Sequence, residues 1–144
     1  MTITKNKPIV RVAGRRRLAV VAVTSAAALA TWAILGPLAG VDFQAKQGSA
    51  TIQVSGVSVF VAATAMAFAG WGLLALLERR TANARKPWTV VAVIACVLSL
   101  GSPLTGGIGI GSKLGLALLH LVVGAVVILG LRRTALSATE RREP

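Results

Sequence analysis

The sequence predicts an all-α membrane protein, a four-helix transmembrane bundle with a short extracytoplasmic loop or β-hairpin between the first and second helices. Of its 144 residues, 55% are hydrophobic and only 14% are charged, whereas about a quarter of the residues in a soluble domain are charged. The hydrophobic residues also gather in four blocks without Asp, Glu, Lys or Arg: 18–38, 57–77, 88–104 and 114–131. Each block is long enough to cross a bilayer, and none has the polar stripe of a soluble helix.

The positions of the basic residues predict the orientation. Fourteen of the sixteen Lys and Arg precede the first block, separate the second from the third, or follow the fourth. Only Lys46 and Lys113 fall in the other two loops. Because short loops rich in Lys and Arg stay in the cytoplasm, we expect both termini there. The expected parts are a basic cytoplasmic segment at 1–17, a transmembrane domain at 18–131 and a fraying cytoplasmic tail at 132–144.

The net charge of +12 could also indicate a nucleic-acid partner. Membrane orientation already accounts for that charge, and no aromatic residues interleave with the basic ones. We therefore expect no nucleic-acid partner. We do expect the basic rim to attract anionic lipid head groups at the cytoplasmic face.

The outer ends of the first and third spans are expected at Gly36-Pro37 and at Gly101 to Pro103, because proline cannot continue a helix without losing a hydrogen bond. The first hydrophobic run continues through Leu38, beyond the core of a usual signal peptide, so we expect an uncleaved span.

In residues 41–46 and 51–55 apolar and polar side chains alternate. That period predicts a β-hairpin, with an irregular loop as the alternative because isolated hairpins are marginal.

Glu78 lies at the inner end of the second span, where the helix dipole disfavours a carboxylate. We expect a structural cytoplasmic ion pair to offset this, with one of three nearby arginines as the partner: Arg79, Arg80 or Arg85. Trp88 opens the third span and is expected to be an interfacial anchor. The glycine-rich stretch 105–113 is expected to be a flexible outer turn.

His120 is the one side chain inside the blocks that titrates near neutral pH. Counting residues inward, at a rise of about 1.5 Å each, brings Thr31, Thr64 and Ser99 close to its depth. An unsatisfied imidazole in hydrocarbon is costly, so we expect a neutral His120 that faces inward. Its expected partner is Ser99, with Thr31 or Thr64 as alternatives, and the bond either specifies packing or senses a proton or a ligand.

The spans carry little else that could do chemistry. They hold no carboxylate, and His120 with the lone Cys96 falls short of the three or four ligands of a zinc site. We therefore expect no catalytic residue, no metal, no cofactor and no enzymatic activity. Small residues at helical spacing support helix packing or association with a partner membrane protein or a second copy: Ala22, Ala26, Ala30, Ala65, Ala69, Gly111 and Gly115.

Two roles remain open. One is a structural or accessory interaction component of the membrane. The other is a small transporter or channel for a small molecule or lipid, with His120 in its path. A water-accessible cavity that reaches His120 would favour the second role, and a closed bundle would favour the first.

Several short motifs occur in a defined order: "GVDF" at 40–43, "WGLLALLERR" at 71–80, Trp88, "SLGSPL" at 99–104 and "LALLHL" at 116–121. Together they resemble an uncharacterised family of small four-span membrane proteins from high-GC bacteria, known only as a domain of unknown function. The resemblance covers most of residues 15–133. It implies a four-helix bundle in the bacterial cell membrane. Two features recur in the family pattern, the turn that ends at Pro103 and the histidine at position 120. The resemblance implies no activity. Ser102, between the glycine and the proline, departs from the pattern.

The orientation can be tested with cysteine labelling. Ser49→Cys or Gly109→Cys should react with a membrane-impermeant thiol reagent added to intact cells, because both positions are expected outside. Ala82→Cys should stay unlabelled. Labelling of the position-82 variant alone would reverse the orientation.

Overall fold

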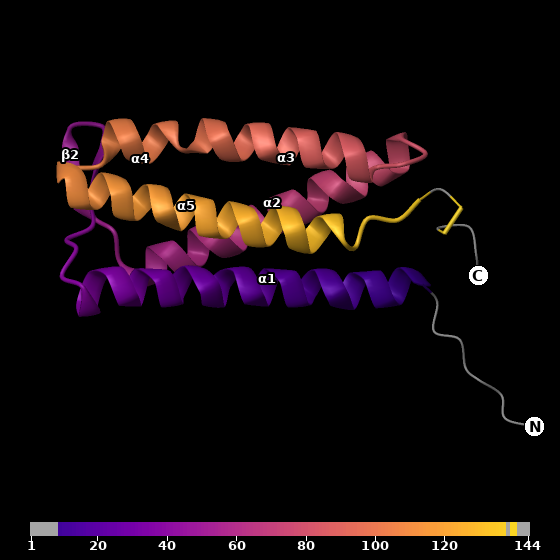
Figure 1. The fold of residues 1–144 in the computed structure, drawn as a ribbon, viewed down its shortest axis with the longest axis horizontal. Helices are drawn as coiled ribbons and strands as arrows, with labels where there is room; N and C mark the ends of the chain where they lie inside the picture. The colour runs from indigo at the N-terminus through magenta and orange to yellow at the C-terminus, as the bar shows by residue number, and fades with distance from the viewer. Residues whose placement is uncertain (1–8, 138, 141–144) are drawn as a thin grey trace, which may run out of the picture.

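The computed structural model describes residues 9–137, 139 and 140 and confirms a bundle of four helical spans with a two-stranded sheet between the first two. The spans are long and apolar enough to cross a membrane: Val12–Leu38, Gly56–Arg80, Arg85–Gly106 and Gly109–Arg132. The hairpin lies at one end of the bundle, here called the hairpin end (Figure 1). The start of the first span, the loop between the second and third, and the end of the fourth lie at the opposite, basic end.

Parts of two predicted segments lie outside the described residues. These are residues 1–8 of the N-terminal segment, with Lys5 and Lys7, and residues 138 and 141–144 of the tail, with Arg141 and Arg142. The remainder of the N-terminal segment is helical, because α1 (Ile9–Ala33) already includes the arginine run. Arginine is a good helix former, and the long side chains of Arg15 and Arg16 are exposed at the end of the span, where their charges reach water.

The first span ends close to its predicted boundary. After α1 the chain makes one wide turn, η1 (Ile34–Leu38), which contains Pro37. A π-type turn tolerates a residue that cannot donate to the preceding turn. Gly40 follows with a positive φ of 73°, the left-handed conformation in which many helices end.

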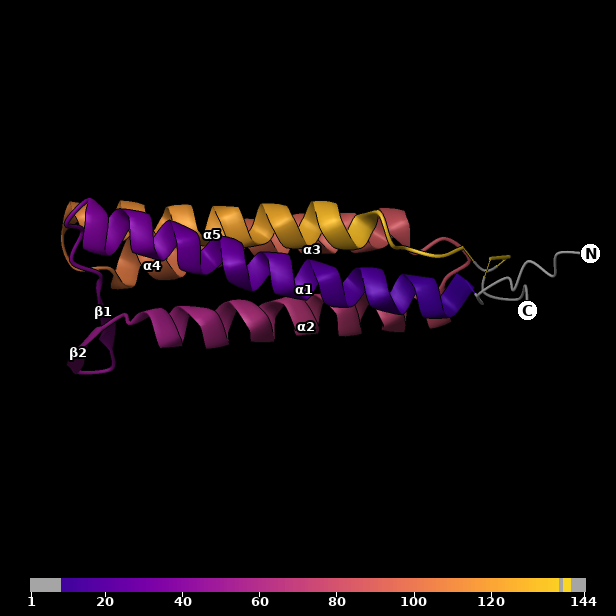
Figure 2. The ribbon, with the colours of Figure 1, turned by 90° about the horizontal axis from the view of Figure 1, so that it is seen from below.

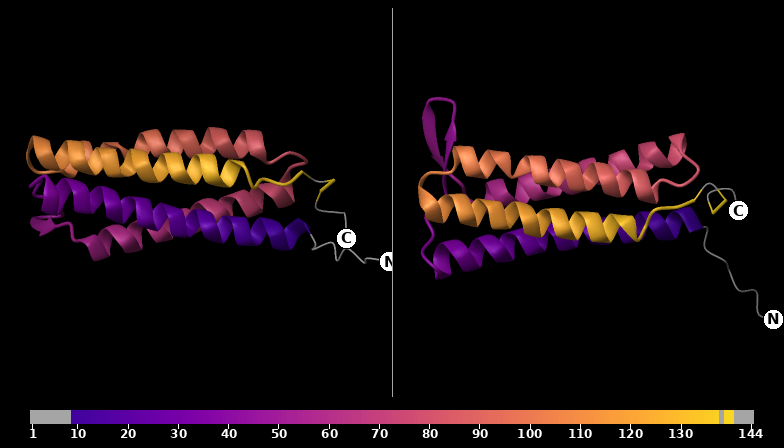
Figure 3. Two further views of the ribbon diagram at one scale, coloured as in Figure 1. Left: turned by 60° about the horizontal axis from the view of Figure 1, so that its bottom comes forward. Right: turned by 45° about the horizontal axis from the view of Figure 1, so that its top comes forward.

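The predicted hairpin is confirmed. Strands β1 (Gln44–Gln47) and β2 (Ala50–Gln53) pair antiparallel, with Gln47 opposite Ala50. The two-residue loop between them begins with Gly48 at a φ of 63°, which suits the first central position of a type II′ turn. Figure 3 shows the hairpin projecting from the end of the bundle.

The third and fourth spans differ from prediction at the hairpin end. Helix α2 (Gly56–Arg80) is continuous, but the third span is divided into α3 (Arg85–Ser99) and α4 (Gly101–Gly106), with Pro103 in the first turn of α4. Helix α5 (Gly109–Arg132) begins before the predicted Leu114. The expected flexible turn is therefore mostly helical. Near hydrocarbon, little water is available to bond the backbone N–H and C=O groups, and a helix bonds them internally.

Helix α1 is the centre of the packing. It contacts both α2 and α5 extensively, and α3 packs mainly on α5, as Figure 2 shows. Two apolar clusters fill the interior: Ala28, Phe43, Val59, Ala63, Leu116 and Leu119 at the hairpin end, and Val21, Ala67, Leu74, Ala84, Trp88, Val127, Leu131 and Ala135 at the basic end. Fully buried alanines, Ala28 and Ala67 among them, let helix backbones approach closely.

The hairpin is fixed to the bundle through its base. The Phe43 ring is buried and sits against Gly115 of α5, where an added Cβ would lie 2.5 Å from the ring carbon Cε1. The Ser112 hydroxyl accepts from the backbone N–H of Gln44 at 3.1 Å and donates to the Asp42 carbonyl. On the other side, the Trp32 indole N–H donates to the Val54 carbonyl at 3.0 Å. These contacts supply the packing surface that an isolated hairpin lacks.

Packing of Phe43 on Gly115 predicts that Gly115→Ala lowers the free energy of unfolding by about 1–3 kcal/mol, the usual cost of overpacking. Gly111→Ala is the matched control, because its nearest contact would be Val41 at an ordinary 3.8 Å. Thermal unfolding in mild detergent measures both. Adding Phe43→Leu should recover part of the Gly115→Ala loss. Equal unfolding temperatures for the two glycine variants would contradict the packing.

Candidate functional site

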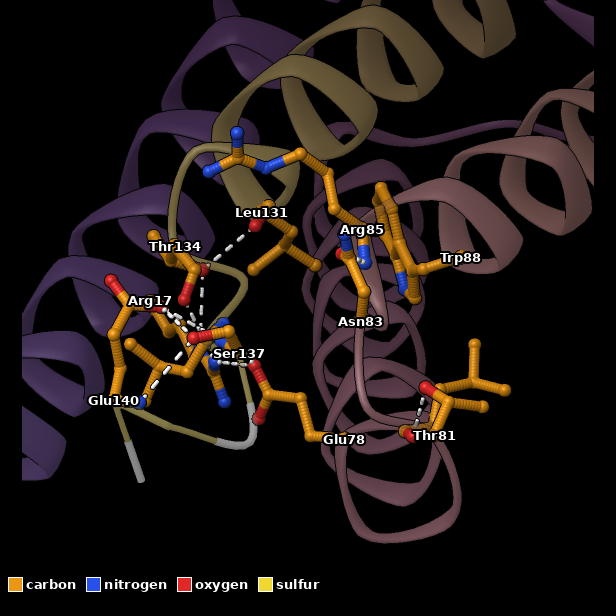
Figure 4. A network of polar contacts seen from close by, with 12 residues as sticks. Arg17, Glu78, Thr81, Asn83, Arg85, Trp88, Leu131, Thr134, Ser137 and Glu140 are labelled. Carbon is orange, nitrogen blue, oxygen red and sulfur yellow. Dashed lines mark hydrogen bonds and ion pairs between the residues drawn. The ribbon is translucent and has the colours of Figure 1, made fainter. Parts of the chain in front are cut away.

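A buried ion pair holds the basic end together. Arg17 of α1 and Glu78 of α2 are 6% and 5% exposed, and Arg17 Nη2 lies 2.6 Å from Glu78 Oε1. Both charges are thus removed from water inside the bundle, and Figure 4 shows the contact between the two side chains. Desolvation of two ions is expensive, so such a pair is tolerated when further hydrogen bonds satisfy the remaining polar atoms.

The segment after α5 supplies those hydrogen bonds. Arg17 Nε donates to the Thr134 hydroxyl at 3.2 Å, and Arg17 Nη2 donates to the Thr134 carbonyl at 2.9 Å. The Leu136 backbone N–H donates to Glu78 Oε1 at 2.8 Å. Among the described residues, no buried side-chain nitrogen or oxygen is left without a partner. One network therefore joins α1, α2 and the C-terminal segment.

Two sequence predictions about this end are wrong. The partner of Glu78 is Arg17, not Arg79, Arg80 or Arg85, all three of which are exposed. Successive helical residues are rotated by about 100°, so Glu78 follows the buried face of Leu74 while its two neighbours turn outward. The first residues of the tail also do not fray. Thr134 and Ala135 are buried, and Ser137 forms a β-bridge with Asn83 of the α2–α3 loop.

Trp88 is another correction, because it is a core residue and not an interfacial anchor. Its side chain is fully buried between α2 and α5 in the basic-end cluster. The indole N–H donates to the Gly70 carbonyl of α2 at 3.1 Å. This bond satisfies the one polar atom of the ring and fixes the start of α3 against α2.

His120 lines an apolar cavity of about 310 Å³ between α2, α3 and α5. Most of its wall is made of Met, Leu, Val, Ile, Ala and Gly side chains, and the polar exceptions include Ser99 and His120. Met66 of the wall is 55% exposed, so the cavity is a groove open on the outer surface of the bundle. It is called the α2–α3 groove below.

The predicted hydrogen bond between His120 and Ser99 is absent, although both residues line the same groove. His120 Nδ1 lies 2.8 Å from the Leu116 carbonyl one turn earlier, and the Ser99 hydroxyl donates to the Cys96 carbonyl at 2.7 Å. A carbonyl only accepts, so the proton of this bond resides on Nδ1. Nε2 makes no hydrogen bond to the described residues.

The alternative partners of His120 are also elsewhere. The Thr31 hydroxyl donates to the Ala27 carbonyl at 2.8 Å, and the Thr64 hydroxyl donates to the Phe60 carbonyl at 2.7 Å. Hydroxyls in helices often bond the preceding turn in this way. Thr64 also pairs with Ser25 of α1 at 2.7 Å. The polar cluster predicted at one depth therefore does not form.

Arg17 was not identified from the sequence as the partner of Glu78, although the spacing of the residues around Arg17 indicates that it is buried. Ala13, Arg17, Val21, Thr24 and Ala28 are all buried and recur every three or four residues, which places them on one helical face. A single arginine on an otherwise small and apolar face is typical of an internal ion pair. The role of Thr134 was also missed. It directly follows a pair of arginines, in a stretch whose composition is that of an exposed tail.

The described residues hold no group of three or more His, Cys, Asp or Glu side chains that could bind a metal ion. In comparison with protein families, residues 8–137 match a family described as a family of unknown function (DUF6069). That match confirms the expected resemblance to an uncharacterised family. No curated protein matches the chain, and no solved structure does.

Truncation tests the C-terminal part of the network. A chain that ends at Arg133 loses the Thr134 acceptors and the Leu136 donor, and each buried polar group left unsatisfied costs roughly 1–3 kcal/mol. We expect a clearly lower unfolding temperature in detergent. A chain that ends at Ser137 keeps all three bonds and should unfold close to the full chain. Equal behaviour of the two truncations would show that the segment does not support the ion pair.

Proposed function

Because the chain belongs to DUF6069, a family of unknown function, we propose its role from its own geometry: a non-enzymatic structural or accessory component of the bacterial cell membrane. It associates laterally, within the bilayer, with another membrane protein. The α2–α3 groove carries this proposal.

The groove has the features of a helix-docking surface. Its wall includes small residues of two helices, Ala69 and Gly70 on α2 and Ala92 and Ala95 on α3, and small residues allow a helix backbone to come close. Met66 at the rim is a flexible side chain that adapts to irregular partners. Helices α2 and α3 contact each other only sparsely, which leaves this face open.

Closure at both ends of the bundle favours lateral binding over passage across the membrane. None of the groove-lining residues comes from the hairpin or from the C-terminal segment. The hairpin end is packed by Phe43 and the basic end by the Arg17–Glu78 pair. The proposal puts the basic end in the cytoplasm, an orientation supported by the distribution of Lys and Arg.

One observation favours the lipid-handling alternative. The groove volume of about 310 Å³ lies at the lower limit of pockets that bind small molecules. His120 in its wall has a ring nitrogen, Nε2, that is free of protein hydrogen bonds within the described part of the chain. A lipid or small apolar molecule with one polar group is the ligand that such a groove would accept.

Site-specific photocrosslinking in native membranes distinguishes the two roles. A photoreactive amino acid at Ala95, in the groove, should give a discrete protein adduct. The control position is Val23 of α1, which is 56% exposed and outside the groove, and it should give none. Filling the groove with Ala69→Leu should abolish the adduct.

Three outcomes decide between the candidates. A groove-dependent protein adduct supports the accessory role. Lipid adducts at Ala95 that disappear with Ala69→Leu, without any protein adduct, support lipid handling. Identical adducts from both positions contradict a specific docking face.

A further inference from the structure

A second cavity lies at the basic end, and arginines form part of its wall. Its volume is about 240 Å³, and its wall includes Arg16 of α1, Arg85 at the start of α3 and Arg133 just after α5. Apolar side chains of α1 and of the C-terminal segment, together with Thr134 and Glu140, complete the wall. Figure 4 shows the Arg85 side chain extending from the start of α3 toward the end of α5. This cavity is called the arginine pocket below.

Within the described part of the chain, no carboxylate lies within ion-pair distance of these three guanidinium groups. None of them donates a side-chain hydrogen bond there, and the ion pair of the described residues involves Arg17 instead. Three like charges around one hollow repel each other. Arg85 is also the first residue of α3, whose N-terminal end adds partial positive charge.

Glu140 is the carboxylate that lines the pocket among the described residues, and it does not neutralise the cluster. Its Oε2 accepts from the Ser137 backbone N–H at 2.8 Å and from the Ser137 hydroxyl at 2.7 Å. These two bonds, and then the charge of Arg85, lower the pKa of the Glu140 carboxyl below its usual value. Glu140 is therefore ionised at neutral pH, and the described wall keeps an excess of positive charge.

We propose that the arginine pocket binds a phosphate group, carried either by a lipid head group or by a soluble molecule. Guanidinium groups match phosphate oxygens in a two-point fork, and three of them approach from three different segments. The pocket is smaller than those that enclose drug-sized ligands, which suits a group of head-group size. Basic pockets between transmembrane helices bind phospholipid head groups in other membrane proteins.

The pocket adjoins the buried ion pair, so binding has a structural consequence. Thr134 lines the pocket and also accepts two hydrogen bonds from Arg17. A bound phosphate that holds Arg133 and Arg85 together would fix the C-terminal segment over the ion pair. Because a ligand stabilises the state that it binds, binding should raise the unfolding temperature. This site is separate from the α2–α3 groove, and the inference does not depend on the proposed function.

The experiment compares single-charge variants at the same end of the protein. Arg16→Gln, Arg85→Gln and Arg133→Gln each remove a pocket charge. Arg79→Gln and Arg80→Gln remove the same charge from exposed positions outside the pocket. One arm titrates phosphatidylglycerol into full-length protein in phosphatidylcholine nanodiscs and follows the unfolding temperature and the retained lipid by native mass spectrometry. The other arm titrates inorganic phosphate against chloride at constant ionic strength.

We expect saturable binding in at least one arm, and the responding arm identifies the source of the phosphate. Each pocket variant should weaken that binding about tenfold or more, since bonds between charged groups are the strong ones. The two control variants should leave it within about twofold. Glu140→Gln should tighten it, a gain that a misfolded protein would not give.

Two results would overturn the inference. The first is the absence of saturable binding in both arms. The second is an equal loss of binding from pocket and control variants, because diffuse attraction to the basic end would produce that pattern.

Discussion

The burial of Arg17 and Glu78 is the constraint on which the basic end of this bundle depends. Neither charge can stay inside the protein alone, because removal of one partner from a buried pair typically costs about 3–5 kcal/mol. The pair therefore fixes how α1 lies against α2. It also requires the chain after α5 to return over the end of the bundle, since Thr134 and Leu136 satisfy the remaining hydrogen bonds. A segment with the composition of a tail becomes part of the fold.

The α2–α3 groove follows from where the other contacts are made. Helix α1 binds α2 and α5 along their lengths, whereas α3 leans mainly on α5. The short α2–α3 loop and the Trp88 bond to Gly70 join α2 and α3 at the basic end. At the hairpin end, Phe43 packs between α1 and α5. The space between these two fixed ends is left open beside His120, and it is the face from which we infer lateral association.

Much of the fold could be predicted from sequence, because hydrocarbon imposes simple rules. Long apolar blocks without charge predict spanning helices, and alternation around Phe43 predicts the hairpin that the structure contains. The helix boundaries follow less directly from the sequence. The glycines from 106 to 111 resemble a loop, yet most of them belong to helices, because backbone hydrogen bonds outweigh glycine's low helix propensity in such surroundings.

The side-chain partners could not be predicted, because they depend on helix rotation and on contacts far apart in sequence. Glu78 has three arginines within seven residues, but its partner is 61 residues away. His120 and Ser99 do share a groove, yet each bonds its own helix. Counting residues gives the depth of a side chain in the membrane. It does not give the direction in which the side chain points, and hydroxyls and imidazoles can satisfy themselves locally.

A double-mutant cycle on the ion pair tests the central claim most directly. Arg17→Met, Glu78→Leu and the double variant would be compared with the wild-type chain by the free energy of unfolding in detergent. Each single variant leaves one buried charge without its partner, whereas the double variant leaves none. The account predicts that the double variant is more stable than the sum of the single losses implies, by at least about 2 kcal/mol. Additive losses, within about 0.5 kcal/mol, would contradict it and would mean that Arg17 and Glu78 do not act as a pair.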